Sequence, residues 1–177
     1  FREYRRAGHE GSLIIVGDGP HLQTLRRRVA ADDIVFTGCL TGQELSTAYA
    51  SADLFVFPST TDTFGNAVLE AQASGLPAIV SDMGGPQGIV EPHQSGLVAD
   101  LSLPDALTEA MVRLSTDAAL YRQARIGALR NARARTWEAV FDRFWHGRCE
   151  AERTEQAVVV TSPRRRADPR TPSTAGA

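Results

Sequence analysis

The sequence predicts an α/β fold, in which a parallel sheet with helices on both faces is followed by C-terminal helices. Residues 12–16 and 78–81 are continuous apolar runs, as expected for strands that are covered on both faces of a parallel sheet. Segments with helical spacing alternate with the apolar runs, which is typical of βαβ units with right-handed crossovers. Turn residues such as Gly75-Leu-Pro77 separate these segments. We therefore expect a Rossmann-like domain.

The expected elements follow in chain order. Strands are predicted at residues 12–16, 34–36, 53–57, 78–81 and, as a short edge strand, 97–98. Helices are predicted at residues 1–7, after Pro20, from Thr41, and at 65–74, 104–114, 118–134 and 136–153, with one helical turn at 87–90. Pro20 fits the first turn of a helix because its missing N–H costs nothing there. Thr41, followed three residues later by Glu44, predicts a capping box.

Two of the predicted helices carry apolar stripes. The helix after Pro20 is expected to direct Leu22, Leu25 and Val29 inward and its three arginines mostly outward. A second stripe lies in the last helix, where it is expected to face the core, and consists of Trp137, Val140, Phe141, Phe144 and Trp145.

Composition excludes several functional classes. The chain has 177 residues, is 42% hydrophobic and 23% charged, and suits one ordinary soluble domain. A formal net charge of −2 gives no reason to expect nucleic-acid binding. Cys39 and Cys149 are too few for a disulfide framework or a zinc site, and no apolar stretch approaches the length of a membrane span. These features predict a cytoplasmic protein with reduced thiols.

The composition changes near residue 154. Residues 1–153 are predicted to form the domain, whereas residues 154–177 contain too little apolar surface to order themselves and form a tail. Four arginines of the tail could contact an anionic membrane surface, but a solvated tail is the preferred interpretation.

Asp62 and Glu70 are the candidate site residues. Asp62 lies on a Pro/Ser/Thr loop at the carboxyl end of the strand at 53–57, and Glu70 lies on the helix that this loop opens. Ligands of open parallel sheets bind at this end of the strands. The unpaired N–H groups that begin the helix suit a phosphate, and the carboxylates accept hydrogen bonds from hydroxyl groups. Together these groups describe a site for a nucleotide-sugar.

The spacing of these acids also resembles a known signature. The run Asp62-x7-Glu70, with its Phe64-Gly65 insert, resembles the Glu-x7-Glu motif of family 4 retaining glycosyltransferases, which have the GT-B fold. Similar enzymes in bacteria move mannose or glucose onto lipids or polysaccharides. The resemblance extends from about residue 14 to about residue 145. Other similar segments are Gly17-Asp-Gly-Pro20, Val35-Phe36-Thr37-Gly38, Leu45, Tyr49, Ala52-Asp53, Gly84-Gly85-Pro86 and Ser95-Gly96-Leu97-Val98.

The resemblance implies roles for the two acids. Glu70 would bind the ribose hydroxyls of the nucleotide, although most helical glutamates are simply exposed. Asp62 would contact hydroxyls of the donor sugar, where the family has a glutamate. Aspartate is one methylene shorter, so this contact would need a shift of the loop or a bridging water. A loop-capping aspartate is the structural alternative.

The remaining candidate residues would act mainly through their backbone. The N–H groups of Phe64, Gly65 and Asn66 would meet the diphosphate or the sugar, with a core position as the alternative for the Phe64 ring. Thr37 and Gly38 match the segment where the family holds the nucleotide base. Gly17 belongs to a Gly-x-Gly turn near the cleft. The sequence shows no Asp-x-Asp metal motif and no ligand spacing among its histidines, so a metal-independent site without a cofactor is expected.

The resemblance also implies a larger protein. A GT-B enzyme has two Rossmann-like domains, and this chain matches only the C-terminal one, without its first strand and most of its first helix. The acceptor site would lie on the N-terminal domain of the same polypeptide, with a possible lipid acceptor at the inner face of the membrane. We therefore expect little transferase activity from the fragment alone. The alternatives are a degenerate, non-catalytic binding module and, less favoured, a nucleotide-sugar epimerase.

Overall fold

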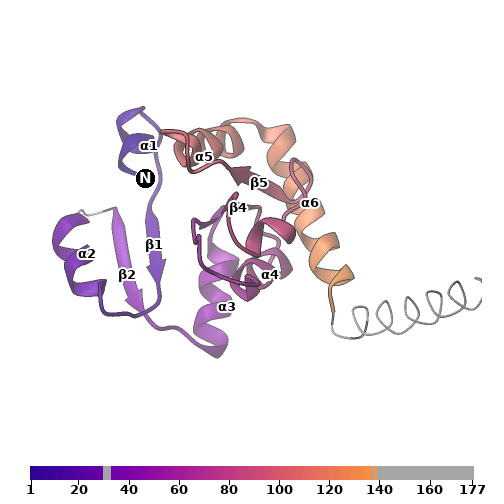
Figure 1. Ribbon diagram of the computed structural model, residues 1–177, viewed down its shortest axis with the longest axis horizontal. Coiled ribbons are helices and arrows are strands. Elements are labelled where there is room, and N and C mark those ends of the chain that lie inside the picture. Colours follow the sequence, from indigo (N-terminus) through magenta and orange to yellow (C-terminus); the bar gives the residue numbers. More distant parts are fainter. Residues whose placement is uncertain (30–32, 137, 139–177) are drawn as a thin grey trace, which may run out of the picture. The chain divides into compact units, whose positions relative to one another are not determined.

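Figure 1 shows the computed structural model, which describes residues 1–29, 33–136 and 138. Each predicted strand is present, with small shifts at its ends. The strands are β1 (Leu13–Val16), β2 (Ile34–Gly38), β3 (Phe55–Phe57), β4 (Ala78–Ser81) and β5 (Gly96–Ala99). The helices are α1 (Arg2–Arg6), α2 (Leu22–Val29), α3 (Gly42–Ser51), α4 (Asn66–Ala73), α5 (Ala106–Thr116) and α6 (Ala118–Ala134), with a 3₁₀ turn at Pro86–Gly88.

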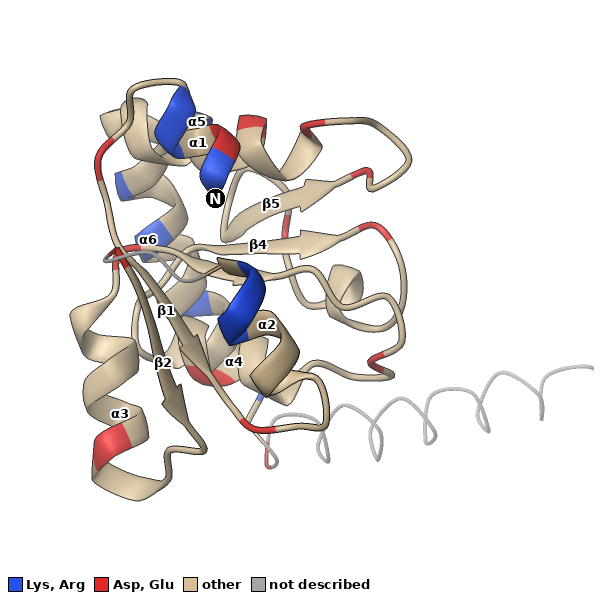
Figure 2. Ribbon diagram, turned by 90° about the vertical axis from the view of Figure 1, so that its left-hand side faces the viewer, with Lys and Arg blue, Asp and Glu red and all other residues tan. Residues whose placement is uncertain are grey.

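All strand pairs are parallel, as the alternation of strands and helices predicts. β3, β4 and β5 form one sheet in that order, with Ile79 of β4 beside Val56 on one side and Leu97 on the other. β1 and β2 form a second parallel pair. Figure 2 shows β4 and β5 side by side and nearly horizontal, with the β1 and β2 arrows sloping steeply downward beside them.

Two apolar clusters cover the faces of the three-stranded sheet. On one face, Ile79 of β4 packs with Leu114 of α5 and Ala124 of α6. On the other face, Val80 packs with Val68 of α4 and with Ile89. Alternate residues of β4 therefore point into different cores, which is why the continuous apolar run at 78–81 marks this central strand.

Local signals define the ends of α4 and α6. α4 ends in a Schellman motif, in which Gly75 (φ +80°) donates its N–H to the Gln72 carbonyl and Leu76 donates to the Ala71 carbonyl, at 2.9 and 3.0 Å. The predicted stop at Gly75 is thereby confirmed. At the start of α6, the Asp117 carboxylate accepts hydrogen bonds from the N–H groups of Ala119 and Leu120.

Three local predictions are wrong. Thr41 precedes α3, but its side chain makes no capping bond to the helix, so no capping box forms. Leu25 of α2 is exposed instead of inward, because α2 buries none of its residues. The first strand is not covered on both faces, because Ile14 and Val16 of β1 are 44% and 41% exposed.

One further expectation differs from the structure in detail, and others concern residues that the structure does not describe. The helical turn expected at 87–90 occurs as the 3₁₀ turn Pro86–Gly88. The helix expected at 136–153, with its apolar stripe, and the tail at 154–177 fall outside the described residues apart from positions 136 and 138. The boundary at residue 153 therefore stays a prediction.

Candidate functional site

The loop after β3 is organised around Asp62. The Asp62 Oδ1 atom accepts a hydrogen bond from the Phe64 N–H at 2.9 Å, and the Asp62 N–H donates to the Ser59 hydroxyl at 3.2 Å. This geometry is an Asx turn, in which a short acidic side chain satisfies the backbone two residues further on. The loop-capping role considered for Asp62 is therefore present in the structure. Phe64 is 54% exposed and does not fill the core.

The N-terminus of α4 offers free backbone donors. Gly65 is the N-cap in the left-handed conformation (φ +95°), and its carbonyl accepts the N–H of Val68 at 2.9 Å. Within the described part of the chain, the N–H groups of Asn66 and Ala67 have no hydrogen-bond partner. These donors, with the positive end of the helix dipole, can bind an anion such as phosphate.

A glycine-rich segment packs directly against this loop. The Gly85 N–H donates to the Asp62 carbonyl at 2.9 Å, and a Cβ atom at Gly85 would lie 2.0 Å from the Thr63 carbonyl oxygen. A Cβ at Gly65 would contact the Pro86 and Ile89 side chains at 3.1 and 3.2 Å. Glycine is therefore required where the two loops touch. The contact holds Gly84-Gly85-Pro86 beside the start of α4.

Glu70 is oriented by a tyrosine from another helix. The Tyr49 hydroxyl of α3 donates to Glu70 Oε2 at 3.1 Å, while the Tyr49 ring meets Phe55 of β3 edge to face. Burial, with the charge and hydrogen bond of Glu70, raises the pKa of Tyr49 to about 12. Glu70 is exposed, so its carboxylate can still accept hydroxyls of a ligand. Sequence analysis did not predict this pair, because no local pattern links residues 21 positions apart.

A buried polar network lies behind α4. The Asn131 amide of α6 donates to Gln72 Oε1 at 2.6 Å and to the Ile89 carbonyl at 2.7 Å. The Gln72 amide donates to the Ser95 hydroxyl at 3.2 Å, and all three side chains are buried. Arg135 completes the network with bonds to Asn131 Oδ1 and to the Gly88 carbonyl. The network joins the helix that bears Glu70 to the segment around the 3₁₀ turn.

The predicted residues near β1 and β2 form a separate group. Gly17 (φ +127°) donates its N–H to the carbonyl of Gly38 (φ +75°) at 2.8 Å. The Thr37 hydroxyl donates to the same carbonyl at 3.0 Å and more weakly to the Ile15 carbonyl at 3.4 Å. The structure thus brings Gly17, Thr37 and Gly38 together at the carboxyl ends of two strands. No hydrogen bond among the described residues joins this group to Asp62 or Glu70.

The described residues contain no cluster of three or more His, Cys, Asp or Glu side chains that could hold a metal ion. None of their helices is long and apolar enough to cross a membrane.

Fold and geometry together define the class of this protein. It is a parallel α/β domain in which the start of α4 presents free backbone N–H groups, and Glu70 an exposed carboxylate, near the carboxyl end of β3, the end at which open parallel sheets bind ligands. More specifically, the chain belongs to the glycosyl transferases group 1 family, whose pattern matches residues 1–117.

Similar proteins of known activity include two mannosyltransferases. The GDP-mannose-dependent alpha-mannosyltransferase of Corynebacterium glutamicum is 36% identical over 154 residues, which are 86% of this chain and 35% of that protein. The protein of the same name from Mycolicibacterium smegmatis is 41% identical over 135 residues, with 73% and 34% coverage. The chain thus spans about a third of the length of these relatives.

Solved structures of glycosyltransferases share the fold. The sucrose-phosphate synthase of Thermosynechococcus elongatus superposes with a TM-score of 0.69 at 26% identity, over 88% of this chain and 41% of that one. A pneumococcal O-GlcNAc transferase, GtfA, solved with UDP and GlcNAc, gives a TM-score of 0.69 at 24% identity over 84% of this chain and 31% of its own. These likenesses confirm the predicted GT-B type α/β fold.

Proposed function

We propose that this chain is the donor-binding half of a retaining hexosyltransferase, with GDP-mannose as its first candidate donor. The observation that carries the proposal is the pair of free N–H groups at the start of α4, followed on the same helix by the exposed Glu70. Helix N-termini bind phosphate, and ionised carboxylates accept hydroxyl donors. The names of the two mannosyltransferase relatives favour GDP-mannose over other nucleotide-sugars.

Each part of the donor would meet a different group. The diphosphate would bind the N–H groups of Asn66 and Ala67, the ribose hydroxyls would bind Glu70, and the sugar would contact the Asp62 loop. The base would lie near Thr37 and Gly38.

The transfer step would proceed without a metal ion or cofactor. Negative charge grows on the departing diphosphate, and fixed N–H donors aimed at it would lower the barrier. The acceptor hydroxyl would be held by an N-terminal domain of a longer polypeptide. In one version of the proposal, this hydroxyl belongs to a lipid at the inner membrane surface. Turnover by the 177-residue chain alone is therefore expected to be slight.

A second candidate function is a non-catalytic nucleotide-sugar-binding module. The Asx turn favours it, because Asp62 Oδ1 is occupied by the Phe64 N–H and the side chain is short. Replacing Asp62 with Glu restores the length that the family signature has. If transfer measured in the longer polypeptide is retained or raised by Asp62→Glu and lost with Asp62→Ala, the catalytic role is supported.

Calorimetric titration with GDP-mannose, GDP and UDP-glucose tests the donor site. Glu70→Ala is expected to weaken binding by about 1–3 kcal/mol, the usual loss for a charge-assisted hydrogen bond. Glu44→Ala removes an exposed glutamate from α3 and should leave the affinity unchanged. Equal affinities of the wild-type and Glu70→Ala proteins for every nucleotide would contradict the proposal.

A further inference from the structure

The Tyr49 hydroxyl of α3 lies between two acceptors on α4. Its oxygen is 3.1 Å from Glu70 Oε2 and 3.4 Å from the Ala67 carbonyl oxygen. Within the part of the chain that the structure describes, these are the only hydrogen bonds between α3 and α4. A hydroxyl donates one proton, and the charged carboxylate is both the nearer and the stronger acceptor. The Tyr49 hydroxyl therefore restrains the carboxylate of Glu70.

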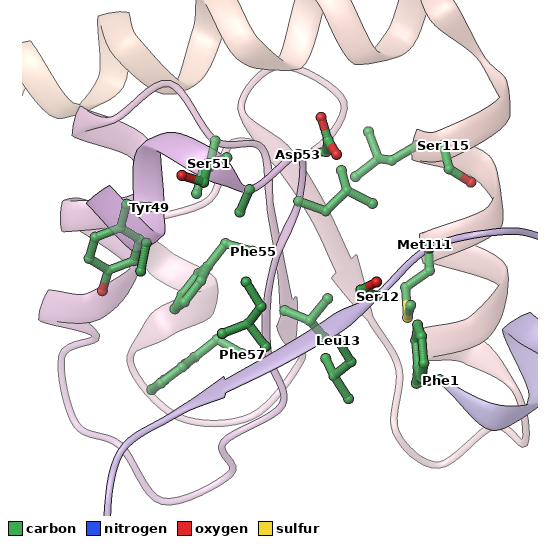
Figure 3. A pocket seen from close by; sticks show the side chains of 18 of the residues that line it. Phe1, Ser12, Leu13, Tyr49, Ser51, Asp53, Phe55, Phe57, Met111 and Ser115 are labelled. Atoms are coloured by element: carbon green, nitrogen blue, oxygen red, sulfur yellow. The ribbon is translucent and has the colours of Figure 1, made fainter. Parts of the chain in front are cut away.

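The ring of Tyr49 is held independently of Glu70. It meets Phe55 of β3 edge to face, with ring centroids 5.7 Å apart, and Phe55 stacks on Phe57 of the same strand at 5.9 Å. Figure 3 shows these three side chains together at one end of a cavity of about 970 Å³ that they help to line. Packing against β3 thus places the hydroxyl. Removal of the hydroxyl alone would leave this packing intact.

Glu70 gains from such a restraint because its side chain is exposed, long and flexible. Asn66, whose free N–H group begins α4, lies four residues before Glu70, which is about 6 Å along the helix axis. A carboxylate that swings along α4 would change its distance from this N–H group by a large part of that spacing. A nucleotide that contacts both groups would then have to fix the carboxylate itself, which lowers its affinity.

On the basis of the function proposed above, in which Glu70 accepts the ribose hydroxyls, we propose that Tyr49 is a positioning residue that gives the site a preference for ribose over deoxyribose. An ionised carboxylate has about four lone-pair positions, so a bond from Tyr49 leaves room for both ribose hydroxyls. A nucleotide that lacks these hydroxyls gains nothing from a fixed Glu70. Tyr49 therefore strengthens binding only of ligands that carry them.

The bond to the Ala67 carbonyl suggests a different role, which makes a separate prediction. If this bond were the important one, Tyr49 would fix the start of α4, where the free N–H groups of Asn66 and Ala67 would bind the diphosphate. Loss of the hydroxyl would then weaken every nucleoside diphosphate equally, with or without ribose hydroxyls. The pattern across ligands therefore separates a positioning role toward Glu70 from a purely structural one.

Calorimetric titration of the 177-residue protein with GDP and with 2′,3′-dideoxy-GDP provides the test. Tyr49→Phe is expected to weaken GDP binding by about three- to tenfold, because the ribose must then order Glu70. The affinity for the dideoxy nucleotide should stay within about twofold of the wild-type value. In a Glu70→Ala background, Tyr49→Phe should cause no further loss, because the group that Tyr49 positions is already absent.

The double variant can be interpreted because Glu70→Ala leaves the Tyr49 hydroxyl with the Ala67 carbonyl as an acceptor. Tyr121→Phe is the matched control. Tyr121 lies on α6, is also partly buried, and its pKa is raised by burial and by the nearby charge of Asp53. Its hydroxyl makes no hydrogen bond to α4, so this variant should bind both nucleotides as the wild-type protein does.

A measurement without ligand tests the restraint itself. Three-bond NMR couplings across the Cα–Cβ bond of Glu70 should report a single rotamer in the wild-type protein and in Tyr121→Phe, and rotamer averaging in Tyr49→Phe. Averaged couplings in the wild-type protein would overturn the proposal. So would an equal loss for both nucleotides, or a further loss in the Glu70→Ala background.

The two proposals fail in different ways. If Glu70→Ala weakens GDP binding but Tyr49→Phe does not, the role of Tyr49 is refuted and the donor site stands. If Glu70→Ala leaves GDP binding unchanged, the proposed donor site is refuted, and the role of Tyr49 with it.

Discussion

Replacing Asn131 with Leu should destabilise the protein more than any single surface change. Asn131 is 4% exposed and donates to two acceptors, Gln72 Oε1 and the Ile89 carbonyl oxygen. Leucine has a similar branched shape but no donor. Both acceptors would then stay buried without their hydrogen bonds. The loss of folding stability would arise more from these unpaired acceptors than from removal of the asparagine itself.

The expected loss can be worked out from these two contacts. Each buried polar atom left without a partner costs about 1–3 kcal/mol. Two such atoms give a loss of about 2–6 kcal/mol in the free energy of unfolding. Burial of the additional apolar surface of leucine offsets part of this loss, so the net destabilisation should be about 2–4 kcal/mol. A domain of this size typically has only about 5–15 kcal/mol of stability in total.

Urea denaturation monitored by circular dichroism provides the measurement. Arg130→Ala, one residue away on α6, is the matched control, because Arg130 is exposed and its ion pair with Glu91 is long at 3.6 Å. Surface pairs of this kind contribute about 0–1 kcal/mol. The double variant Gln72→Met/Asn131→Leu should lose less than the sum of the two single losses, because removal of both partners leaves fewer orphaned groups.

Two outcomes would refute this reasoning. One is a loss below about 1 kcal/mol for Asn131→Leu, equal to that of Arg130→Ala, which would mean that the orphaned acceptors find other partners. The other is strict additivity in the double variant, which would mean that Gln72 and Asn131 do not depend on each other.

Further predictions concern a helical glycine, a tyrosine and the loop. Gly127→Ala should lower the thermal midpoint of unfolding, because the new Cβ would lie 1.7 Å from the Gln94 carbonyl oxygen. This clash should outweigh the preference of helices for alanine over glycine, which is about 1 kcal/mol. Gly88→Ala is the control, because the space around its Cβ is open. Absorbance titration should place the pKa of Tyr49 near 12 in the wild-type protein and lower in Glu70→Ala. Since an unfolded tyrosine loses its proton near pH 10, stability should fall as the pH rises from 10 to 12, and Tyr49→Phe should reduce this fall. Asp62→Ala should cost about 1 kcal/mol in urea unfolding by removing the bond from the Phe64 N–H, whereas Asp62→Asn, which keeps an acceptor, should cost less.

Local patterns in the chain predicted most of the fold. The apolar run at 78–81 and the stop at Gly75 are confirmed, because each depends on signals within a few residues: continuous apolar character for a strand buried on both faces, and the left-handed conformation for a helix end. The spacing of Asp62 and Glu70 predicted where the candidate site lies. Their roles stay predictions.

The prediction of a capping box at Thr41 was wrong because the local sequence pattern does not by itself fix the structure there. The sequence pattern permits a bond between side chain and backbone, but the conformation of the turn decides whether it forms, and in the structure Thr41 makes no such bond. Likewise, α2 has a suitable apolar spacing, yet Leu25 is exposed, because inward and outward are defined only by what packs against the helix.

The sequence by itself therefore determined the order and type of the strands and helices, and the helix end at Gly75. Only the tertiary structure decided that Tyr49 meets Glu70 and that Asn131 holds Gln72 behind the site. The physical reason is one of range. Backbone conformation responds to neighbours along the chain, whereas hydrogen bonds between distant residues and the pairing of sheet edges depend on which surfaces the folded chain brings together.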